Sequence, residues 1–331
     1  MKALITGGTG FIGSNLALRY RADGDEVVVL ARTATDAERE NAADLEKAGV
    51  ALQIGSITEP DRVAQAVRGV DVVHHIAATM REANLPDRVF WEVNVEATRR
   101  LLEASRSAGV KRFVYCSSIG AMGKTPAKPA SEESPCEPQD IYQKTKRAAE
   151  LACLEYHREH GFPLSIVRPA EVYGPRDRRL LKLFKTIARG TFAMIGSGRN
   201  HHHLVYIDDM VQGFRLAAQR PEAVGQIFII AGGLPVALDD LVLIISRQLE
   251  VKVRRLRIPL LPVRLAAALV EGICAPLGVQ PPIYRRRVDF FRSDYSFDIS
   301  KARKIIGYEP EFDVERGIGE TLAWYRRRAL L

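Results

Sequence analysis

Tyr142 and Lys146 are the residues of this chain whose types and spacing most directly suggest chemistry. They stand four positions apart in DIYQKTK (140–146), at the start of a segment with a helical pattern, and residues four apart are neighbours on one helix face. A phenol has a pKa of about 10, but an adjacent ammonium stabilises the phenolate and lowers that pKa. The pair could therefore act as a general acid and base, although a solvated helix face would show the same spacing.

The elements around this pair alternate between short apolar strands and amphipathic helices. We predict strands at residues 2–6, 26–31, 50–54, 70–77, 112–117 and 164–169, and the clearest helices at 89–109 and 141–160. Repeated strand and helix units predict an α/β fold with a Rossmann-like, doubly wound parallel sheet. Helices on both faces of the sheet explain why the strands are apolar throughout.

The pattern loosens after about residue 170. Helices are predicted at 178–189, 208–219, 238–250, 262–275 and 314–329, and two further strands at 203–208 and 226–231. We expect residues 1–170 to form a dinucleotide-binding domain, with residues 203–232 adding to its sheet. Residues 171–331 should form a smaller, mostly helical substrate lobe. Ligands of open α/β sheets bind at the carboxyl ends of the strands, so the site should lie there.

A glycine-rich turn joins the first strand to the next helix. In LITGGTGFIG, the glycines at 8, 10 and 13 fit GxGxxG, and those at 7, 10 and 13 fit GxxGxxG. A glycine turn before a helix N-terminus lets backbone amides approach a pyrophosphate with no Cβ in the way. A turn without a ligand is the alternative. We expect a dinucleotide to be bound by Gly7, Gly10, Phe11, Ile12 and Gly13.

The end of the second strand bears on the choice between NAD and NADP. A carboxylate there would bind the adenosine ribose of NAD, but the strand ends VVVLART, with Ala31 in that position and Arg32 next. Nothing in this stretch repels a 2′-phosphate, and a guanidinium can bind one. The sequence favours NADP(H). NAD(H) is the alternative, because Arg32 could equally be a surface arginine.

A third chemical group comes from the fifth strand, which ends CSSIGAMG. In a parallel sheet this end opens on the same cleft as the sixth strand and its helix, so a serine hydroxyl can hold the substrate oxygen. Tyr142 would then pass a proton to or from that oxygen while hydride moves to or from carbon.

Six motifs, in order along nearly the whole chain, resemble the extended short-chain dehydrogenase/reductase family, the NAD-dependent epimerases and dehydratases. They are TGGTGFIG, HHIAA, NVEATRRLLEA, CSSIGAMG, YQKTK and RPAEVYGPRD. The resemblance implies that Ser118, Tyr142 and Lys146 are catalytic. It implies further cofactor contacts from Ser56, Ile57, Ala77, Ala78, Asn94, Pro169 and Val172, with Tyr142 and Lys146 also touching the cofactor. Ser56 replaces the family's usual acidic residue near the adenine, which weakens that contact. The resemblance also implies a homodimer formed through the helices at 89–109 and 141–160.

The residues expected near the substrate differ from those of the family's sugar-nucleotide enzymes. Glu171 stands where those enzymes usually have an asparagine that binds the sugar nucleotide, and His202 where they have an arginine for the diphosphate. A buried diphosphate needs charge-assisted donors. Ile119 and Gly120 replace the Asp-Glu pair of the sugar dehydratases. What remains resembles the branch with 3β-hydroxysteroid dehydrogenases and dihydroflavonol reductases. We expect Ser118, Glu171 and His202 to contact an apolar substrate.

Composition and charge limit the other classes of function that this chain could have. The chain has 331 residues and a net charge of +8, but no nucleic-acid recognition motif accompanies its basic residues. The apolar stretch 258–284 is interrupted by charges and prolines, which excludes a transmembrane segment and leaves surface docking open. An N-terminus without a signal-peptide pattern predicts a cytoplasmic protein. Four cysteines lack metal spacing, and the three histidines at 201–203 would alternate along a strand, so no metal site is expected.

Three functions are consistent with these features. The favoured one is an NAD(P)-dependent oxidoreductase that interconverts a secondary alcohol and a ketone on a small, apolar substrate. The second is a nucleotide-sugar 4-epimerase that uses tightly bound NAD. The third is a non-catalytic NAD(P)-binding regulator, although such proteins commonly lose the tyrosine or lysine that this chain retains.

Overall fold

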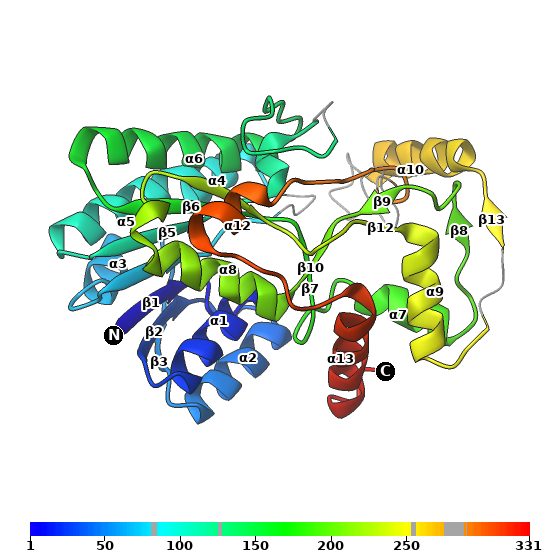
Figure 1. The fold of residues 1–331 in the computed structure, drawn as a ribbon, viewed down its shortest axis with the longest axis horizontal. Coiled ribbons are helices and arrows are strands. Elements are labelled where there is room, and N and C mark those ends of the chain that lie inside the picture. Colours follow the sequence, from blue (N-terminus) through cyan, green and yellow to red (C-terminus); the bar gives the residue numbers. More distant parts are fainter. Residues whose placement is uncertain (81–84, 125–127, 253–255, 275–287, 289) are drawn as a thin grey trace.

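The centre of the molecule is a seven-stranded parallel sheet (Figure 1). The computed structural model describes the chain except for residues 81–84, 125–127, 253–255, 275–287 and 289. The strand order is β11-β6-β5-β4-β1-β2-β3. These strands are β1 (Lys2–Thr6), β2 (Glu26–Ala31), β3 (Ala51–Ile54), β4 (Val72–His75), β5 (Arg112–Cys116), β6 (Leu164–Pro169) and β11 (Ile227–Ile230). The order reverses between β1 and β4, the point where doubly wound sheets bind ligands.

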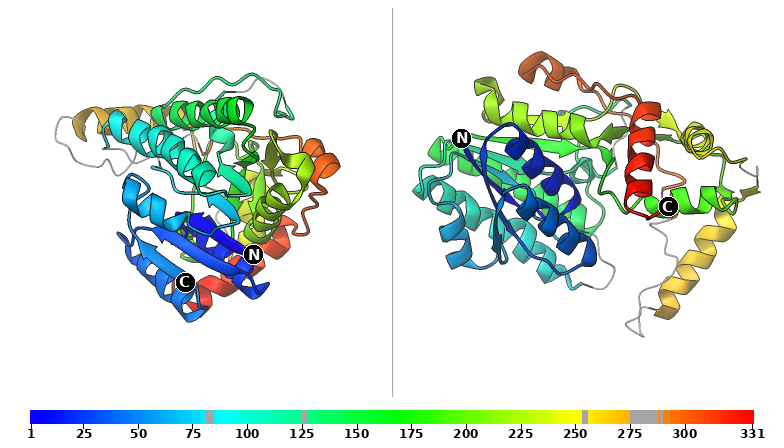
Figure 2. Two further views of the ribbon diagram at one scale, coloured as in Figure 1. Left: turned by 90° about the vertical axis from the view of Figure 1, so that its left-hand side faces the viewer. Right: turned by 90° about the horizontal axis from the view of Figure 1, so that it is seen from below.

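Each face of the sheet packs on its own hydrophobic core. On β1, Ala3 and Ile5 belong to one core and Leu4 to the other, because successive side chains of a strand point to opposite faces. The first core is covered by α1 (Phe11–Ala22), α2 (Asp36–Lys47) and α8 (Ile207–Gln219). The second is covered by α3 (Pro60–Ala66), α5 (Ala97–Ser107) and α6 (Ile141–His160) (Figure 2). The predicted doubly wound α/β fold is therefore confirmed.

The second half of the chain differs from the prediction in the placement of one predicted strand and in several short strands that were not predicted. The six strands predicted first all occur, with bounds that differ by two residues at most. Of the two later strands, β11 extends the sheet, but β10 (Leu204–Tyr206) pairs with β7 (Glu171–Tyr173) in a separate two-stranded sheet. The Ala170 N–H still donates to Ile230 at 2.9 Å. The chain leaves the main sheet directly after this bond, so β7 pairs with β10 outside that sheet.

The C-terminal part is mostly helical and lies beyond the carboxyl ends of the sheet strands (Figure 1). Its helices are α7 (Leu181–Ala188), α9 (Leu238–Gln248), α10 (Leu260–Cys274) and α13 (Val314–Arg327), while α12 (Ser300–Ile306) packs near β11. Two more small sheets pair β12 (Val236–Ala237) with β9 (His201–His202), and β13 (Arg257–Ile258) with β8 (Met194–Ile195). Short helical turns complete the described chain at α4 (Asp87–Trp91), η1 (Glu92–Glu96), η2 (Ile119–Met122) and η3 (Pro221–Ala223). Within the described ranges, no helix combines the length and apolar character needed to cross a bilayer.

Candidate active site

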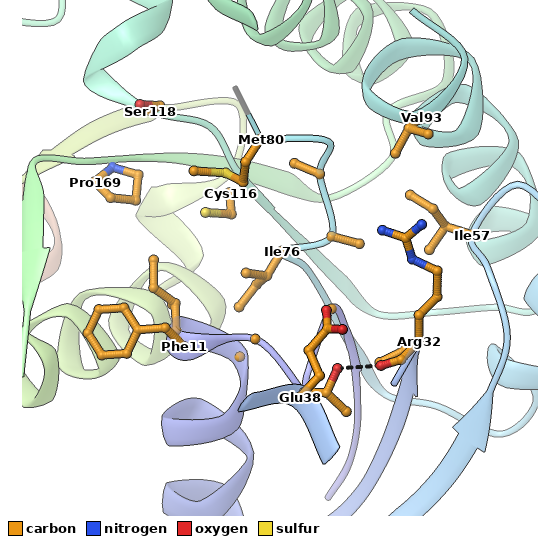
Figure 3. A pocket seen from close by; sticks show the side chains of 18 of the residues that line it. Phe11, Arg32, Glu38, Ile57, Ile76, Met80, Val93, Cys116, Ser118 and Pro169 are labelled. Atoms are coloured by element: carbon orange, nitrogen blue, oxygen red, sulfur yellow. Dashed lines mark hydrogen bonds between the residues drawn. The ribbon is translucent and has the colours of Figure 1, made fainter. Parts of the chain in front are cut away.

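A cleft opens at the carboxyl ends of the sheet strands (Figure 3). It gathers most of the residues that the sequence predicted, although they come from segments far apart in the chain. They are Gly7, Gly10, Phe11, Ile12, Gly13, Arg32, Ser56, Ile57, Ala77, Ala78, Ser118, Tyr142, Lys146, Pro169 and Val172. The fold therefore brings the glycine turn and the Tyr142–Lys146 pair to one cavity.

The glycine turn after β1 brings the backbone very close to its neighbours. Gly7 has φ +69°, and a Cβ at this residue would lie 2.8 Å from the backbone of Ala77. A Cβ at Gly13 would lie 2.4 Å from the carbonyl oxygen of Gly7, so both positions require glycine. α1 begins directly after Gly10, and no side chain in the described part of the chain caps its first amides. This open helix start fits the diphosphate of a dinucleotide.

The other end of the cleft carries Arg32 and Ile57. The Thr9 hydroxyl donates to the carbonyl oxygen of Arg32 at 2.7 Å, and the Arg32 guanidinium extends toward Ile57 (Figure 3). Glu38, from the first turn of α2, lines the same end. Glu38 was not predicted, because the expected ribose contact lies at the end of the strand and Glu38 follows six residues after Arg32. Its carboxylate accepts a hydrogen bond from Thr35 N at 2.9 Å in the capping box of α2. This end of the cleft therefore carries one cationic and one anionic side chain.

The first turns of α6 position Tyr142 and Lys146. The Asp140 carboxylate accepts a hydrogen bond from Gln143 N at 2.9 Å, and the Gln143 side chain returns to the backbone of Asp140, which forms a capping box. The helix ends at Gly161, whose φ is +61°. These signals account for the agreement between predicted and observed bounds. Tyr142 and Lys146 are both buried in the wall of the cleft.

Lys146 joins α6 to the end of β5. Its Nζ donates to the carbonyl oxygen of Cys116 at 2.5 Å and lies 4.4 Å from the centre of the Tyr115 ring. Burial lowers the pKa of the Lys146 ammonium, because the charged form loses solvation. The hydrogen bond and the ring face compensate part of that loss. The lysine is thus fixed one helical turn from Tyr142.

Ser118 follows β5 and caps the short helical turn η2. Its Oγ accepts a hydrogen bond from Gly120 N at 2.9 Å. A hydroxyl that accepts one bond still has its own proton to donate. Ser118 can therefore donate to an oxygen atom bound in the cleft. With Tyr142 and Lys146, it completes a set of groups able to hold and protonate a substrate oxygen.

Asn94 supports this set from behind the cleft wall. It lies in the π-helical turn η1, and such turns are frequent at functional sites. Its side chain accepts from Thr79 N at 2.7 Å and donates to Thr145 Oγ1 at 3.1 Å. Thr145 precedes Lys146 on α6. Asn94 therefore ties the loop after β4 to the helix that carries the tyrosine and lysine, and it is not among the described residues that line the cleft.

His75 extends the same buried network and makes stability depend on pH. Its ring nitrogens bond the hydroxyls of Thr6 at 2.7 Å and Thr98 at 2.9 Å. Burial, and secondarily the charge of Lys146, lowers the pKa of His75 to about 3. An unfolded histidine titrates near 6.5. Between these values the unfolded chain binds the extra proton, so stability is complete above about pH 6.5 and falls as the pH falls.

We therefore expect His75→Gln to reduce the acid sensitivity of the fold. Glutamine can bond both hydroxyls but does not titrate. The loss in free energy of unfolding between pH 7 and pH 5, measured by urea titration, should be smaller in the variant by on the order of 1–2 kcal/mol. Equal losses in the variant and the parent protein would show that His75 is not the titrating group.

Arg179 is a second cleft residue that was not predicted. Its Nε donates to Asp177 at 2.8 Å and its Nη2 to the carbonyl oxygen of Val172 at 2.6 Å. The guanidinium carbon lies 5.3 Å from the centre of the Phe11 ring. These contacts hold a cation between the glycine turn and the strand that follows Pro169. In the sequence it belongs to a basic run, PRDRR (175–179), with no indication that one member lines the cleft.

Glu171 and His202, predicted to contact substrate, meet one another. His202 Nδ1 lies 2.9 Å from a carboxylate oxygen of Glu171, and the His202 side chain is fully buried beside the Phe290 ring. Neither residue is among the described residues that line the cleft. Contact with substrate remains a prediction for this pair.

The three consecutive histidines do not converge. His201 is exposed and lies 3.0 Å from Asp294, His202 contacts Glu171, and His203 bonds the carbonyl oxygen of Gly232 at 3.0 Å. The described residues contain no group of histidine, cysteine and carboxylate side chains arranged to hold a metal ion.

Comparison with known proteins identifies the family. Residues 3–231 match the NAD dependent epimerase/dehydratase family. The chain belongs to this family. The resemblance to extended short-chain dehydrogenases/reductases is thereby confirmed, and the protein is an enzyme of that family. NAD(P) is the family's cofactor, and the residues of the glycine turn fit it.

Relatives in the family differ in activity. The chain is 30% identical over 343 residues to a 3β-hydroxysteroid dehydrogenase/Δ5→4-isomerase of Mycobacterium tuberculosis, covering 98% of this chain and 90% of the relative. It is 29% identical over 345 residues to a UDP-glucose 4-epimerase of Mycolicibacterium smegmatis, covering 99% and 100%. The crystal structure of DesIV, a dTDP-glucose 4,6-dehydratase from Streptomyces venezuelae with NAD and TYD bound, superposes with a TM-score of 0.78 at 29% identity, covering 99% and 97%.

Proposed function

We propose that this enzyme interconverts a secondary alcohol and a ketone on an apolar substrate, with NADP(H) as the hydride carrier. The observation that carries the proposal is the position of Ser118, Tyr142 and Lys146 in the same cleft as the glycine turn. Such a cleft can hold a dinucleotide and a reacting carbon together. The similarity to a 3β-hydroxysteroid dehydrogenase supports an apolar substrate.

Each polar group of the cleft has a role in this reaction. The Ser118 hydroxyl donates to the substrate oxygen and orients it, and Tyr142 takes the alcohol proton during oxidation or returns it during reduction. Lys146 stabilises the phenolate form of Tyr142 by its charge. The bound nicotinamide would accept or give the hydride. Asn94 and Thr145 hold α6 in place while the proton moves.

A nucleotide-sugar 4-epimerase is the second candidate, supported by the similarity to a UDP-glucose 4-epimerase. The contact between Glu171 and His202 argues against it. A carboxylate already engaged by a histidine offers no donor to a diphosphate and would repel it.

Cofactor retention separates the two candidates. An epimerase must return hydride to the same substrate and keeps its cofactor, whereas a dehydrogenase must exchange oxidised for reduced cofactor at each turnover. Purified protein should therefore lose its nicotinamide nucleotide on dialysis and regain activity when NADP(H) is added. Stoichiometric NAD retained after dialysis would favour the epimerase.

We further propose that Arg32 gives the preference for NADP(H), and that Glu38 limits it. Arg32→Ala should raise the KM for NADPH about tenfold or more, the value of a charge-assisted hydrogen bond, with little change for NADH. Glu38→Gln should lower the KM for NADPH, because a repelling carboxylate is removed. Glu40→Gln, an exposed change on the same helix, is the matched control. Equal changes for both cofactors would defeat this assignment.

We also propose that the domain division is functional and that the enzyme is a homodimer. Residues 1–170 with β11 would bind the cofactor, and residues 171–331 would shape the substrate site. The helices α5 and α6, with the neighbouring α4, would form the dimer interface, which the exposure of Trp91 (42%) and Leu151 (50%) supports. Light scattering at micromolar concentration should give twice the chain mass, and a monomer would contradict the proposal.

A further inference from the structure

The helix α10 exposes a stripe of large apolar side chains. Leu261, Leu265, Leu269 and Ile273 are 66%, 64%, 66% and 55% exposed. They are spaced by four residues and therefore lie along one face of the helix. Ala267 is the single buried residue among the fifteen of α10. The helix lies at the edge of the C-terminal part, remote from the sheet (Figures 1 and 2).

The apolar surface continues into the preceding strand. Leu256 is 59% exposed and Ile258, in β13, is 37% exposed. Six of the thirteen exposed large apolar side chains of the described residues thus fall between positions 256 and 273. Scattered exposed leucines need no explanation, but a contiguous group marks an interaction surface.

The same region holds most of the protein's excess positive charge. By sequence, residues 251–292 contain nine lysines and arginines against two acidic residues, a net charge of +7 in a chain whose total is +8. Of the basic residues that the structure describes, Lys252 is exposed and Arg257 is exposed but paired with Asp239 at 2.6 Å. Arg264 lies on α10 itself. An apolar stripe beside basic side chains is the pattern of a helix that lies on an anionic bilayer.

We propose that α10, with Leu256 and Ile258, docks this enzyme on a membrane surface that carries anionic lipids. The helix would lie in the plane of the membrane, because fifteen residues extend about 22 Å and cannot cross a hydrocarbon core of about 30 Å. Its leucines would enter the boundary between headgroups and acyl chains. Lys252 and Arg264, which lie before and on the helix, would face the lipid phosphates.

Charge argues against a second copy of this chain as the occupant. A two-fold interface would place two like surfaces against each other, each from a segment of net charge +7. The apolar stripe equally disfavours nucleic acid, which is bound through polar and basic contacts. Docking itself does not depend on the proposed reaction. The added idea that an apolar substrate enters from the bilayer does rest on it.

Flotation of the full-length protein with lipid vesicles tests the proposal. We expect the protein to float with vesicles of phosphatidylcholine and phosphatidylglycerol, and to bind phosphatidylcholine alone about tenfold or more weakly. The double variant Leu265→Glu/Leu269→Glu should lose binding, whereas Leu234→Glu, at a leucine 78% exposed outside α10, should not. Circular dichroism and turnover of a water-soluble ketone should be unchanged in both variants.

Several results would overturn the proposal. Absence of flotation, equal flotation with both lipids, or flotation that the double variant retains would each do so. A different result would identify α10 as an interface between copies of the chain. In that case neither the parent protein nor the double variant floats, and light scattering finds a dimer for the parent and a monomer for the variant. Vesicle binding is measured without catalysis. A membrane-binding protein that reduces no ketone would therefore refute only the proposed function.

Discussion

Tyr142→Phe should lower kcat by about 10²–10⁴-fold, the usual contribution of a positioned general acid or base. The change removes one oxygen atom from a buried side chain in the cleft wall and leaves the ring in place. Without the phenol, the proton has no donor or acceptor beside the substrate oxygen. Ser118 would still bind that oxygen through its hydroxyl.

Cofactor binding should survive this substitution, because the glycine turn and Arg32 are unaltered. The change in NADPH fluorescence on binding would give the dissociation constant of the cofactor. Single-turnover kinetics would give the rate constant of the chemical step. Tyr156→Phe is the matched control, since Tyr156 lies on the same helix and bonds Glu103 at 2.6 Å outside the cleft. A Tyr142→Phe enzyme with unchanged kcat would remove the acid and base assignment.

Glu150→Gln should have the largest effect on stability. Glu150 and Arg168 are both buried and form two hydrogen bonds, of 2.7 and 2.9 Å. Glutamine keeps one acceptor but removes the charge, which leaves the buried guanidinium without its ion-pair partner. Breaking a buried pair in this way costs about 3–5 kcal/mol. Urea titration at neutral pH measures the change in free energy of unfolding.

The effect should also reach the active site. Glu150 lies one turn beyond Lys146 on α6, and Arg168 directly precedes Pro169 at the end of β6. Their ion pair thus joins two elements that wall the cleft. Glu155→Gln, on the same helix, is the control. Glu155 is exposed, and its carboxylate forms a long ion pair of 3.9 Å with Arg158. Such surface pairs contribute about 0–1 kcal/mol. A similarly small change for Glu150→Gln would contradict the importance of the pair.

Local signals explain what the sequence could predict. The strands of the sheet are apolar on both faces, which marks their extent in the sequence. The helix α6 begins after a capping residue, Asp140, and ends before Gly161, so its bounds could be predicted. The glycine turn was readable because any Cβ at Gly7 or Gly13 would collide with backbone. In each case the structure is determined by residues close together in the sequence or by the regular alternation of side chains along a strand.

Features that depend on distant packing were not predictable. Strand β10 was expected in the main sheet, but its partner β7 leaves that sheet after Ala170. Glu38 and Arg179 face the cleft because of how α2 and the segment before α7 turn over it. The contact between Glu171 and His202 unites β7 with β9, which no spacing along the chain indicates.

Net turnover followed by the absorbance of NADPH tests the central claim most directly. A panel of apolar ketones, including 3-ketosteroids, and UDP-galactose would be offered to the wild-type enzyme and to Tyr142→Phe. We predict that the wild type oxidises one NADPH for each ketone reduced, and that the variant is nearly inactive. Conversion of UDP-galactose to UDP-glucose without any net change in cofactor, and with no ketone reduced, would contradict the account.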